Sequence, residues 1–257
     1  MAKRLLLGGG AIGAAAALAT GVAILSRHHE SVASGETEIA APLQANGPRE
    51  FCVRSNFNLV EGMAGQCLTP PQFEALRSRP VIDWNGGEVD LALTGPGPSD
   101  PSKPVNNCAD YDALTAKGWF ALSNADMRRE GYFKRACGAL FWLARARPAA
   151  RTYFTDGAAS SADIASMARS MRMGMGADVE TASNVEKVSD HVWRLAGVNV
   201  AAQIFEIAHA DFSGGGLGEI LTYVQMNAVG GTAVAGSVGL MEKEDPSGRC
   251  VFKPNEG

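Results

Sequence analysis

Three side chains that can take part in proton transfer lie close together on one segment of the chain. Glu206, His209 and Asp211 fall in a stretch whose composition favours a β-strand. Because side chains two residues apart point to the same face of a strand, we expect His209 and Asp211 to face the same side. A histidine next to a carboxylate can act as a general base, so this neighbourhood is a candidate hydrolase site. The sequence identifies no nucleophile for it, and a purely structural role is the interpretation we favour.

Residues 211–219 form a second candidate, a glycine-rich loop between two predicted strands. Its sequence, DFSGGGLGE, resembles the Asp-x-Asn-x-Asp-Gly calcium loops of extracellular β repeats. Oxygen ligands at alternate positions, with a glycine for the turn, suit Ca²⁺. The fifth position is Gly215 where such a loop has a carboxylate, so only Asp211, Ser213 and Glu219 could supply ligands. The alternative, which we favour, is a glycine turn without metal.

A cluster of methionines is the third feature with possible chemistry. Met167, Met171, Met173 and Met175 lie within a short stretch, and thioethers bind soft Cu(I). Ordinary core methionines also recur one helical turn apart, and no histidine lies near these four in the sequence. We therefore expect them to be core residues.

The N-terminus determines the compartment in which these residues would work. Lys3 and Arg4 precede an uncharged apolar run from Leu5 to Leu25. The glycines at 8–13 match a dinucleotide-binding loop, but the helix after such a loop should be amphipathic, and residues 11–20 carry no charge. About 20 apolar residues are enough to cross a bilayer, with basic residues on the cytoplasmic side. The sequence therefore predicts an N-terminal helix that exports the rest of the chain.

Two forms of this leader remain open. Residues 1–33 could be an uncleaved signal anchor, or a signal peptide that is removed at a small-x-small site. In the first case the protein contacts the membrane through Leu5–Leu25 on the periplasmic side of the bacterial inner membrane; in the second it is soluble in the periplasm. Residues 34–50 are polar and are expected to be a flexible tether, which leaves residues 51–257 as a single exported domain.

The five cysteines are interpreted through that compartment, because exported proteins usually pair them. We expect disulfides between Cys52 and Cys67, closing a short loop, and between Cys108 and Cys137, joining a connection to a long helix. Cys250 is then unpaired. Spacing alone does not establish the pairing.

The domain is expected to have an α+β fold, with helices in the first two thirds followed by a C-terminal antiparallel β-meander. A hairpin is predicted over 81–94, before an irregular proline-rich connection at 95–107. The predicted helices cover about 70–79, 109–117, 124–147 and 161–173. The predicted strands cover about 187–195, 198–210, 219–227 and 232–242.

The helix predicted over 124–147 is rich in basic residues. Its apolar stripe contains Phe133, Cys137, Leu140, Phe141 and Ala144. The basic side chains are expected on its other faces, at positions 128, 129, 134, 135, 145 and 147. These faces could meet anionic lipid head groups, although a solvated surface is the interpretation we favour.

The formal net charge of −4 argues against a nucleic-acid-binding protein, which would carry a basic footprint. We expect no cofactor. The leader and the lack of a catalytic signature favour a non-catalytic envelope protein, acting as a binding, scaffold or assembly-accessory domain with a protein partner. The alternatives are an exported hydrolase using Glu206, His209 and Asp211, and a periplasmic metal-handling protein.

Overall fold

A computed structural model describes residues 49–171, 184–197, 200–230 and 234–255. All of them belong to one unit, Asn46–Gly257. The predicted leader, nearly all of the predicted tether, and Met173 and Met175 lie outside the described residues. Within those residues no helix is both long enough and apolar enough to span a membrane.

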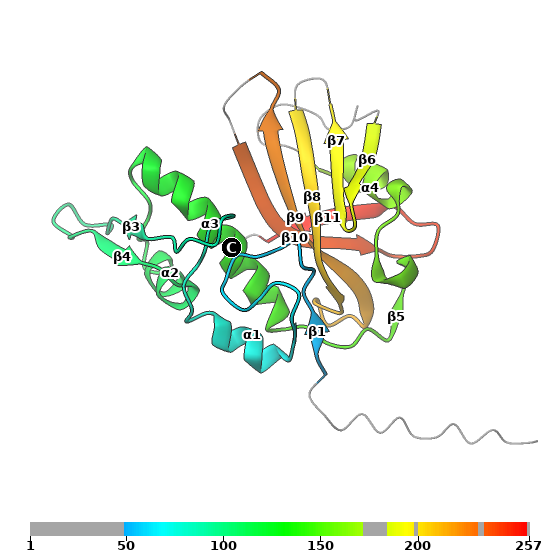
Figure 1. The fold of residues 1–257 in the computed structure, drawn as a ribbon, viewed down its shortest axis with the longest axis horizontal. Coiled ribbons are helices and arrows are strands. Elements are labelled where there is room, and N and C mark those ends of the chain that lie inside the picture. Colours follow the sequence, from blue (N-terminus) through cyan, green and yellow to red (C-terminus); the bar gives the residue numbers. More distant parts are fainter. Residues whose placement is uncertain (1–48, 172–183, 198–199, 231–233, 256–257) are drawn as a thin grey trace, which may run out of the picture. The chain divides into compact units, whose positions relative to one another are not determined.

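The C-terminal part is an antiparallel meander, as predicted from the sequence (Figure 1). Every strand on the path pairs with its neighbour in the chain, because short links can join only adjacent antiparallel strands. The short strand β5 (Arg151–Thr152) adds a parallel pairing with β9. The six strands of the meander are β6 (Asn184–Ser189), β7 (Val192–Ala196), β8 (Val200–Ala210), β9 (Leu217–Ala228), β10 (Val234–Lys243) and β11 (Cys250–Pro254).

Two details of the predicted sheet were wrong. The strand predicted over 187–195 is a hairpin, in which β6 and β7 are separated by a turn at Asp190 and His191. His191 adopts a φ of 62°, a left-handed conformation that glycine most often takes. Because a histidine occupies this position, no glycine indicated the turn in the sequence. Strand β11 was not predicted, because its five residues are too few to show a clear alternation.

Four α-helices precede the meander within the described residues, as the coarse α+β prediction requires. Asn107, Ser123 and Ser160 each cap a helix by accepting a hydrogen bond from the backbone N–H three residues later. Gln72 accepts one from the N–H of Thr69 at the start of α1, over 2.8 Å. The helices are α1 (Pro70–Leu76), α2 (Cys108–Thr115), α3 (Asn124–Leu143) and α4 (Ser161–Ala168).

Helix α3 is shorter than predicted, and the reason is tertiary. Its last residue is Leu143, not Arg147. The backbone groups of Arg147 and Asp211 exchange two hydrogen bonds of 2.9 Å, so the chain leaves the helix to join the sheet.

Short strands are interspersed among the helices, so the first part of the domain is mixed rather than helical. Strand β1 (Phe51–Cys52) pairs with β2 (Cys67–Leu68). Of the hairpin predicted over 81–94, only an isolated bridge between Ile82 and Glu88 is present. The second half, β3 (Leu91–Leu93), pairs instead with β4 (Lys103–Val105), across the connection predicted to be irregular.

Both expected disulfides are present. Cys52–Cys67 joins β1 to β2, and Cys108–Cys137 joins α2 to α3. Cys250 is unpaired and completely buried, and burial raises the pKa of its thiol to about 12. An uncharged buried thiol is a poor nucleophile, so Cys250 acts as a core residue.

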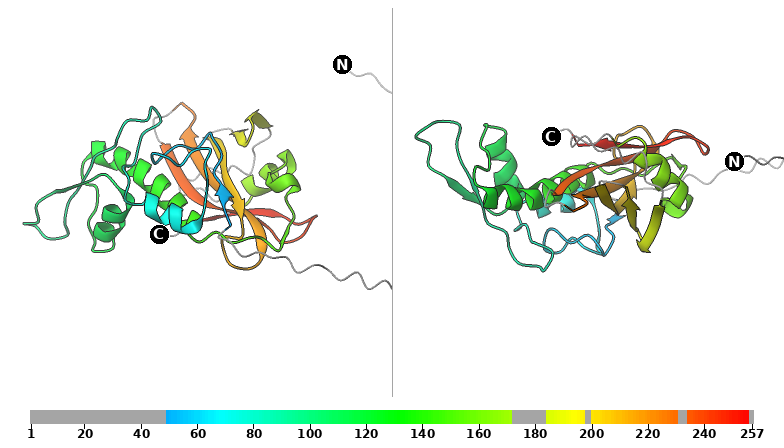
Figure 2. Two further views of the ribbon diagram at one scale, coloured as in Figure 1. Left: turned by 60° about the horizontal axis from the view of Figure 1, so that its bottom comes forward. Right: turned by 90° about the horizontal axis from the view of Figure 1, so that it is seen from above.

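The sheet separates two hydrophobic cores. Helix α3 and the N-terminal segments pack on one face, where Phe57, Phe133 and Leu140 are fully buried. Helix α4 packs on the other face, where Met167 and Met171 belong to the core. In both views of Figure 2 the strands lie between α3 and α4. The two described methionines of the candidate copper cluster are therefore packing residues in this structure.

Candidate functional site

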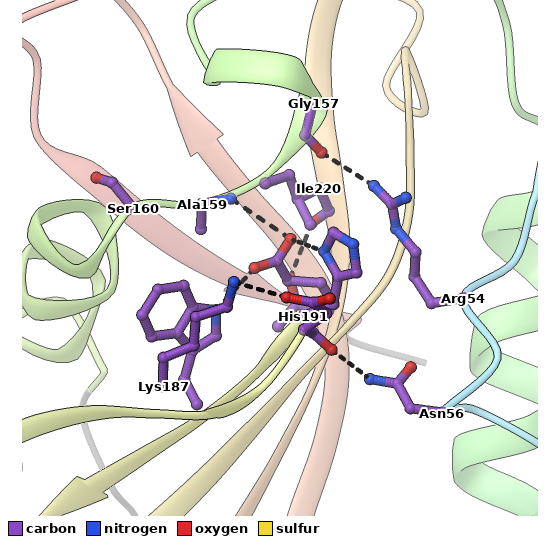
Figure 3. A network of polar contacts seen from close by, with 12 residues as sticks. Arg54, Asn56, Gly157, Ala159, Ser160, Lys187, His191 and Ile220 are labelled. Atoms are coloured by element: carbon purple, nitrogen blue, oxygen red, sulfur yellow. Dashed lines mark hydrogen bonds and ion pairs between the residues drawn. The ribbon is translucent and has the colours of Figure 1, made fainter.

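Glu206 of β8 is the centre of a polar network that includes the β6–β7 hairpin and the segment before α4. Figure 3 labels two of its partners, His191 and Ala159. The Glu206 side chain is only 1 % exposed. The indole Nε1 of Trp193 donates to it over 2.7 Å, and the backbone N–H of Ala159 donates over 3.4 Å. The Nδ1 atom of His191 lies 3.2 Å from the same carboxyl group. The fold thus supplies several donors to one buried carboxyl.

A β-bulge decides which way Glu206 and His209 point. The register between β8 and β9 shifts between Glu206 and Ala208, so that Glu206 pairs with Thr222 and His209 pairs with Ile220. Thr222 and Ile220 are two residues apart and share a face. Glu206 and His209 therefore share the face that carries α4, although an odd spacing in a regular strand would separate them.

The His209 ring is held by packing and by one hydrogen bond. Its Nε2 lies 3.0 Å from the hydroxyl of Thr152. A Cβ added at Gly218 would come within 2.5 Å of that nitrogen, and one at Gly157 within 3.1 Å of the ring, so both glycines permit this close packing. Burial, and then the charge of Arg54, lower the pKa of His209 below its ordinary value of 6.5.

His209 and Asp211 share no hydrogen bond among the described residues. Asp211 accepts hydrogen bonds from the backbone N–H groups of Gly214 and Gly216, over 2.7 and 2.9 Å. The Thr152 hydroxyl is the candidate nucleophile that the sequence analysis lacked, but it also accepts a hydrogen bond from the Phe154 N–H. The three predicted residues thus have three separate sets of hydrogen-bond partners.

Two side chains from the N-terminal segment extend the network (Figure 3). Arg54 donates to the carbonyl of Gly157 over 3.3 Å, and Asn56 donates to the carbonyl of Asp190 over 3.4 Å. They attach the β1 segment to the β6–β7 turn and to the segment before α4. Sequence reasoning missed Arg54, Asn56 and His191. A buried glutamate on an apolar strand does require donors, and that signal could have directed attention to the neighbouring strands.

The glycine-rich loop satisfies its own carboxylates. Asp211 is bonded within the loop as described above. Glu219 accepts hydrogen bonds from the backbone N–H groups of Phe212 and Ser213, over 2.8 and 2.9 Å. Asp211 and Glu219 are 4 % and 3 % exposed, so these bonds compensate for burial. Among the described residues, no three His, Cys, Asp or Glu side chains are grouped in a way that could hold a metal ion. The geometry is that of a hydrogen-bonded glycine turn.

An open groove lies elsewhere, between α2, α3 and the β10 strand. Its volume is about 930 Å³, within the range of pockets that hold small molecules. Neither Glu206 nor His209 lines it. The lining residues are Tyr111, Asp112, Thr115, Ala116, Trp119, Glu130, Lys134, Arg135, Cys137, Gly138, Phe141, Gly236, Ser237, Val238 and Asn255.

Both carboxylates in the groove have basic partners. Glu130 lies 3.0 Å from the ammonium of Lys134 and accepts a hydrogen bond of 3.1 Å from the hydroxyl of Tyr111. Burial, together with the negative charge of Glu130, raises the pKa of Tyr111, which keeps its hydroxyl a hydrogen-bond donor. Asp112 pairs with Arg77, although burial outweighs this partner and raises the pKa of Asp112. The acidic side chains of the groove are thus largely engaged by the protein itself.

Arg135 differs from these groups because it has no carboxylate partner among the described residues. It is 8 % exposed, and its Nε donates to the carbonyl of Gly131 over 3.1 Å. Its guanidinium carbon lies 4.5 Å from the ring centres of Trp84 and Tyr132, and 5.2 Å from that of Tyr223. The expectation that position 135 belongs to a solvated face of the helix was wrong, because α3 also buries this side against the sheet.

No protein-family model, curated protein or solved structure matches this chain. The functional conclusion therefore depends on the geometry of the described residues. That geometry offers a closed polar network around Glu206 and an open groove that contains Arg135.

Proposed function

We propose that this protein is a non-catalytic binding domain that works on the periplasmic side of the bacterial inner membrane, where its leader tethers it. The groove between α2, α3 and β10 is its binding site. The observation that carries this proposal is the contrast between the two candidate regions. The groove has room for a ligand of ordinary size, whereas the groups around Glu206 and His209 are engaged by the protein.

The composition of the groove supports binding rather than catalysis. Aromatic side chains, Trp119 and Phe141, supply apolar contact area, and charged groups can orient a bound molecule. The groove contains no histidine, and its one serine, Ser237, donates its hydroxyl to the carbonyl of Val238. The hydroxyl of Thr115 likewise donates to backbone carbonyls, so neither hydroxyl is directed at a general base.

The disulfides support the exported location, because such bonds persist mainly in oxidising compartments. Cys108–Cys137 also connects α2 to α3, and Cys137 lines the groove. The bond holds two walls of the proposed site together. A location in the periplasm would keep it intact.

The test of the binding site uses a matched pair of substitutions, one within α2 and one at its C-cap. Ala116 is exposed and lines the groove, whereas Ala113 is exposed and does not. We expect Ala116→Trp to narrow the groove and Ala113→Trp to leave it open. Wild-type protein and Ala113→Trp should then retain the same specific partner from solubilised membranes, and Ala116→Trp should lose it. Retention of the same partner by all three proteins, or no specific partner for the wild type, would contradict the proposal.

The location is tested separately with reporters fused after Gly257. An alkaline phosphatase fusion should be active, because that enzyme requires disulfides formed outside the cytoplasm. A fusion to a fluorescent protein that matures only in the cytoplasm should be dark. A bright fluorescent fusion with an inactive phosphatase fusion would show that the domain stays inside the cell.

A further inference from the structure

The groove contains one charged group whose hydrogen-bonding capacity is mostly unused. A guanidinium has five N–H donors in one plane. In Arg135, the Nε donor bonds to the carbonyl of Gly131, and the guanidinium also makes a side-chain hydrogen bond with Tyr223. Aromatic rings on the faces of a guanidinium do not occupy donors that lie in its plane. The remaining N–H groups of Arg135 have no hydrogen-bond partner among the described residues and are available to a ligand.

The aromatic residues around Arg135 hold its charge in a buried position. Burying a charge without a partner is costly, and contacts with ring faces compensate in part. Trp84 is itself stacked on Phe205, whose ring in turn stacks on Tyr223. These rings orient the guanidinium before any ligand arrives. A preoriented planar donor pair suits a carboxylate, which accepts two parallel hydrogen bonds.

The charges next to the groove favour an anion. Lys103 lies 4.6 Å from the ring centre of Trp119, and Arg145 lies 3.7 Å from that of Phe141. Both rings line the groove. Neither cation has a carboxylate partner within the part of the chain that the structure describes. The groove therefore has basic surroundings in a chain whose formal net charge is −4.

We infer that the groove binds a carboxylate on an apolar chain or ring, with the carboxylate paired to Arg135. This inference rests on the proposed binding function and names the chemistry of the ligand. Trp119, Phe141 and Val238 supply the apolar contacts for the body of the ligand. The carboxylate replaces the missing acidic partner of Arg135. The same chemistry occurs in a fatty acid and at the C-terminus of a peptide.

The test compares carboxylates with their uncharged amides, which have nearly the same shape. Full-length protein in nanodiscs is titrated calorimetrically with hexanoate and hexanamide, and with N-acetyl-phenylalanine and its amide; empty nanodiscs serve as the blank. We expect at least one carboxylate to bind about tenfold or more tightly than its amide, since hydrogen bonds to charged groups are the stronger ones. The pair that shows this preference identifies an alkyl or a peptide-like ligand.

Variants assign the preference to the groove and to Arg135. Arg135→Gln should remove the difference between carboxylate and amide, Ala116→Trp should abolish binding, and Ala113→Trp should bind as the wild type does. If Arg135→Gln does not fold, Arg135→Lys provides the comparison, because it keeps the charge and loses the planar donor pair. It should then bind the carboxylate more weakly than the wild type.

Three results would overturn the inference: no carboxylate binds, each amide binds as well as its carboxylate, or an Arg135 variant keeps the full preference. The proposed binding function would still stand in those cases if Ala116→Trp alone loses the partner captured from membranes. A different result is that all three proteins capture the same partner, while the wild type binds a carboxylate more tightly than its amide and Arg135→Gln does not. In that case the groove is not the site for the membrane partner, but it remains the site for the carboxylate.

Discussion

Two of the buried charged side chains, Glu206 and Arg135, lie on opposite faces of the sheet and have very different surroundings. Glu206 is 1 % exposed and receives donors from Trp193 and Ala159. Arg135 is 8 % exposed, lies among aromatic rings, and has only the Gly131 carbonyl and the Tyr223 side chain as hydrogen-bond partners within the described residues. A buried charge whose partners all come from the protein contributes to folding. A buried charge with unused donors in a groove is suited to binding a ligand.

The largest effect is expected from Glu206→Ala, which tests the first half of this comparison. The substitution leaves the indole N–H of Trp193 buried without an acceptor and removes the partner of His191. We expect the free energy of unfolding to fall by about 3–5 kcal/mol, measured by urea denaturation. The control is Glu186→Ala, because Glu186 forms an exposed ion pair with Arg194; its effect should stay within about 1 kcal/mol. Equal losses in the two variants would contradict the structural role of Glu206.

The second-largest loss of stability is expected when one partner of a buried ion pair is removed. Lys243 lies 2.9 Å from Asp163, and the two side chains are 12 % and 11 % exposed. Burial opposes ionisation of Asp163, but hydrogen bonds from Lys243 and Ser160 hold its pKa below the ordinary value of 3.8. We expect Lys243→Met to lower the free energy of unfolding by about 2–3 kcal/mol, since Ser160 still contacts the carboxylate.

The pH dependence of that loss provides its check. A lowered folded-state pKa contributes stability above the unfolded value, and this contribution disappears as the pH falls through the folded-state pKa. The difference between wild type and Lys243→Met should therefore shrink below pH 3.8. A control variant, Lys187→Met, breaks the exposed pair with Asp190 and should change stability little at any pH. A difference between wild type and Lys243→Met that is constant over the whole pH range would argue against the ion pair.

Arg135→Gln is expected to cost less stability than either change and tests the second half of the comparison. It removes ring contacts worth about 1–2 kcal/mol, but it leaves no acidic group of the described residues without a partner. The matched control is Arg129→Gln, which alters an exposed arginine of the same helix. Urea denaturation of both variants measures the difference. A loss as large as that of Glu206→Ala would make Arg135 a structural residue and remove the contrast.

The smallest effect is expected from His209, which lies beside the Glu206 network. Because burial and Arg54 lower its folded-state pKa below 6.5, the unfolded chain takes up a proton that the folded protein does not. Stability should therefore decrease as the pH falls from 7 through 6.5 towards the folded-state pKa. In His209→Gln this part of the pH dependence should be missing, as measured by thermal unfolding across that range. The same slope in both proteins would show that His209 does not titrate differently on folding.

The features predicted correctly from the sequence depend on residues that are close together in the chain. The helices predicted to begin near 109, 124 and 161 do begin close to these positions, because the side chains of Asn107, Ser123 and Ser160 each accept a hydrogen bond from an N–H three residues later. The meander follows from alternating strands with links too short for any other connection. The disulfide pairs were expected from the order and spacing of the cysteines, and both are present.

The amino-acid sequence by itself thus determined the approximate starts of the helices, the meander and the residues available for chemistry. The partners of those residues were decided only by the tertiary structure. A single bulge turns His209 to the same face as Glu206, and the packing of α3 on the sheet buries Arg135 among rings from distant segments. Such contacts depend on strand register and on how helices pack against the sheet. Both are set by the combined packing of the whole domain, so no short stretch of sequence contains them.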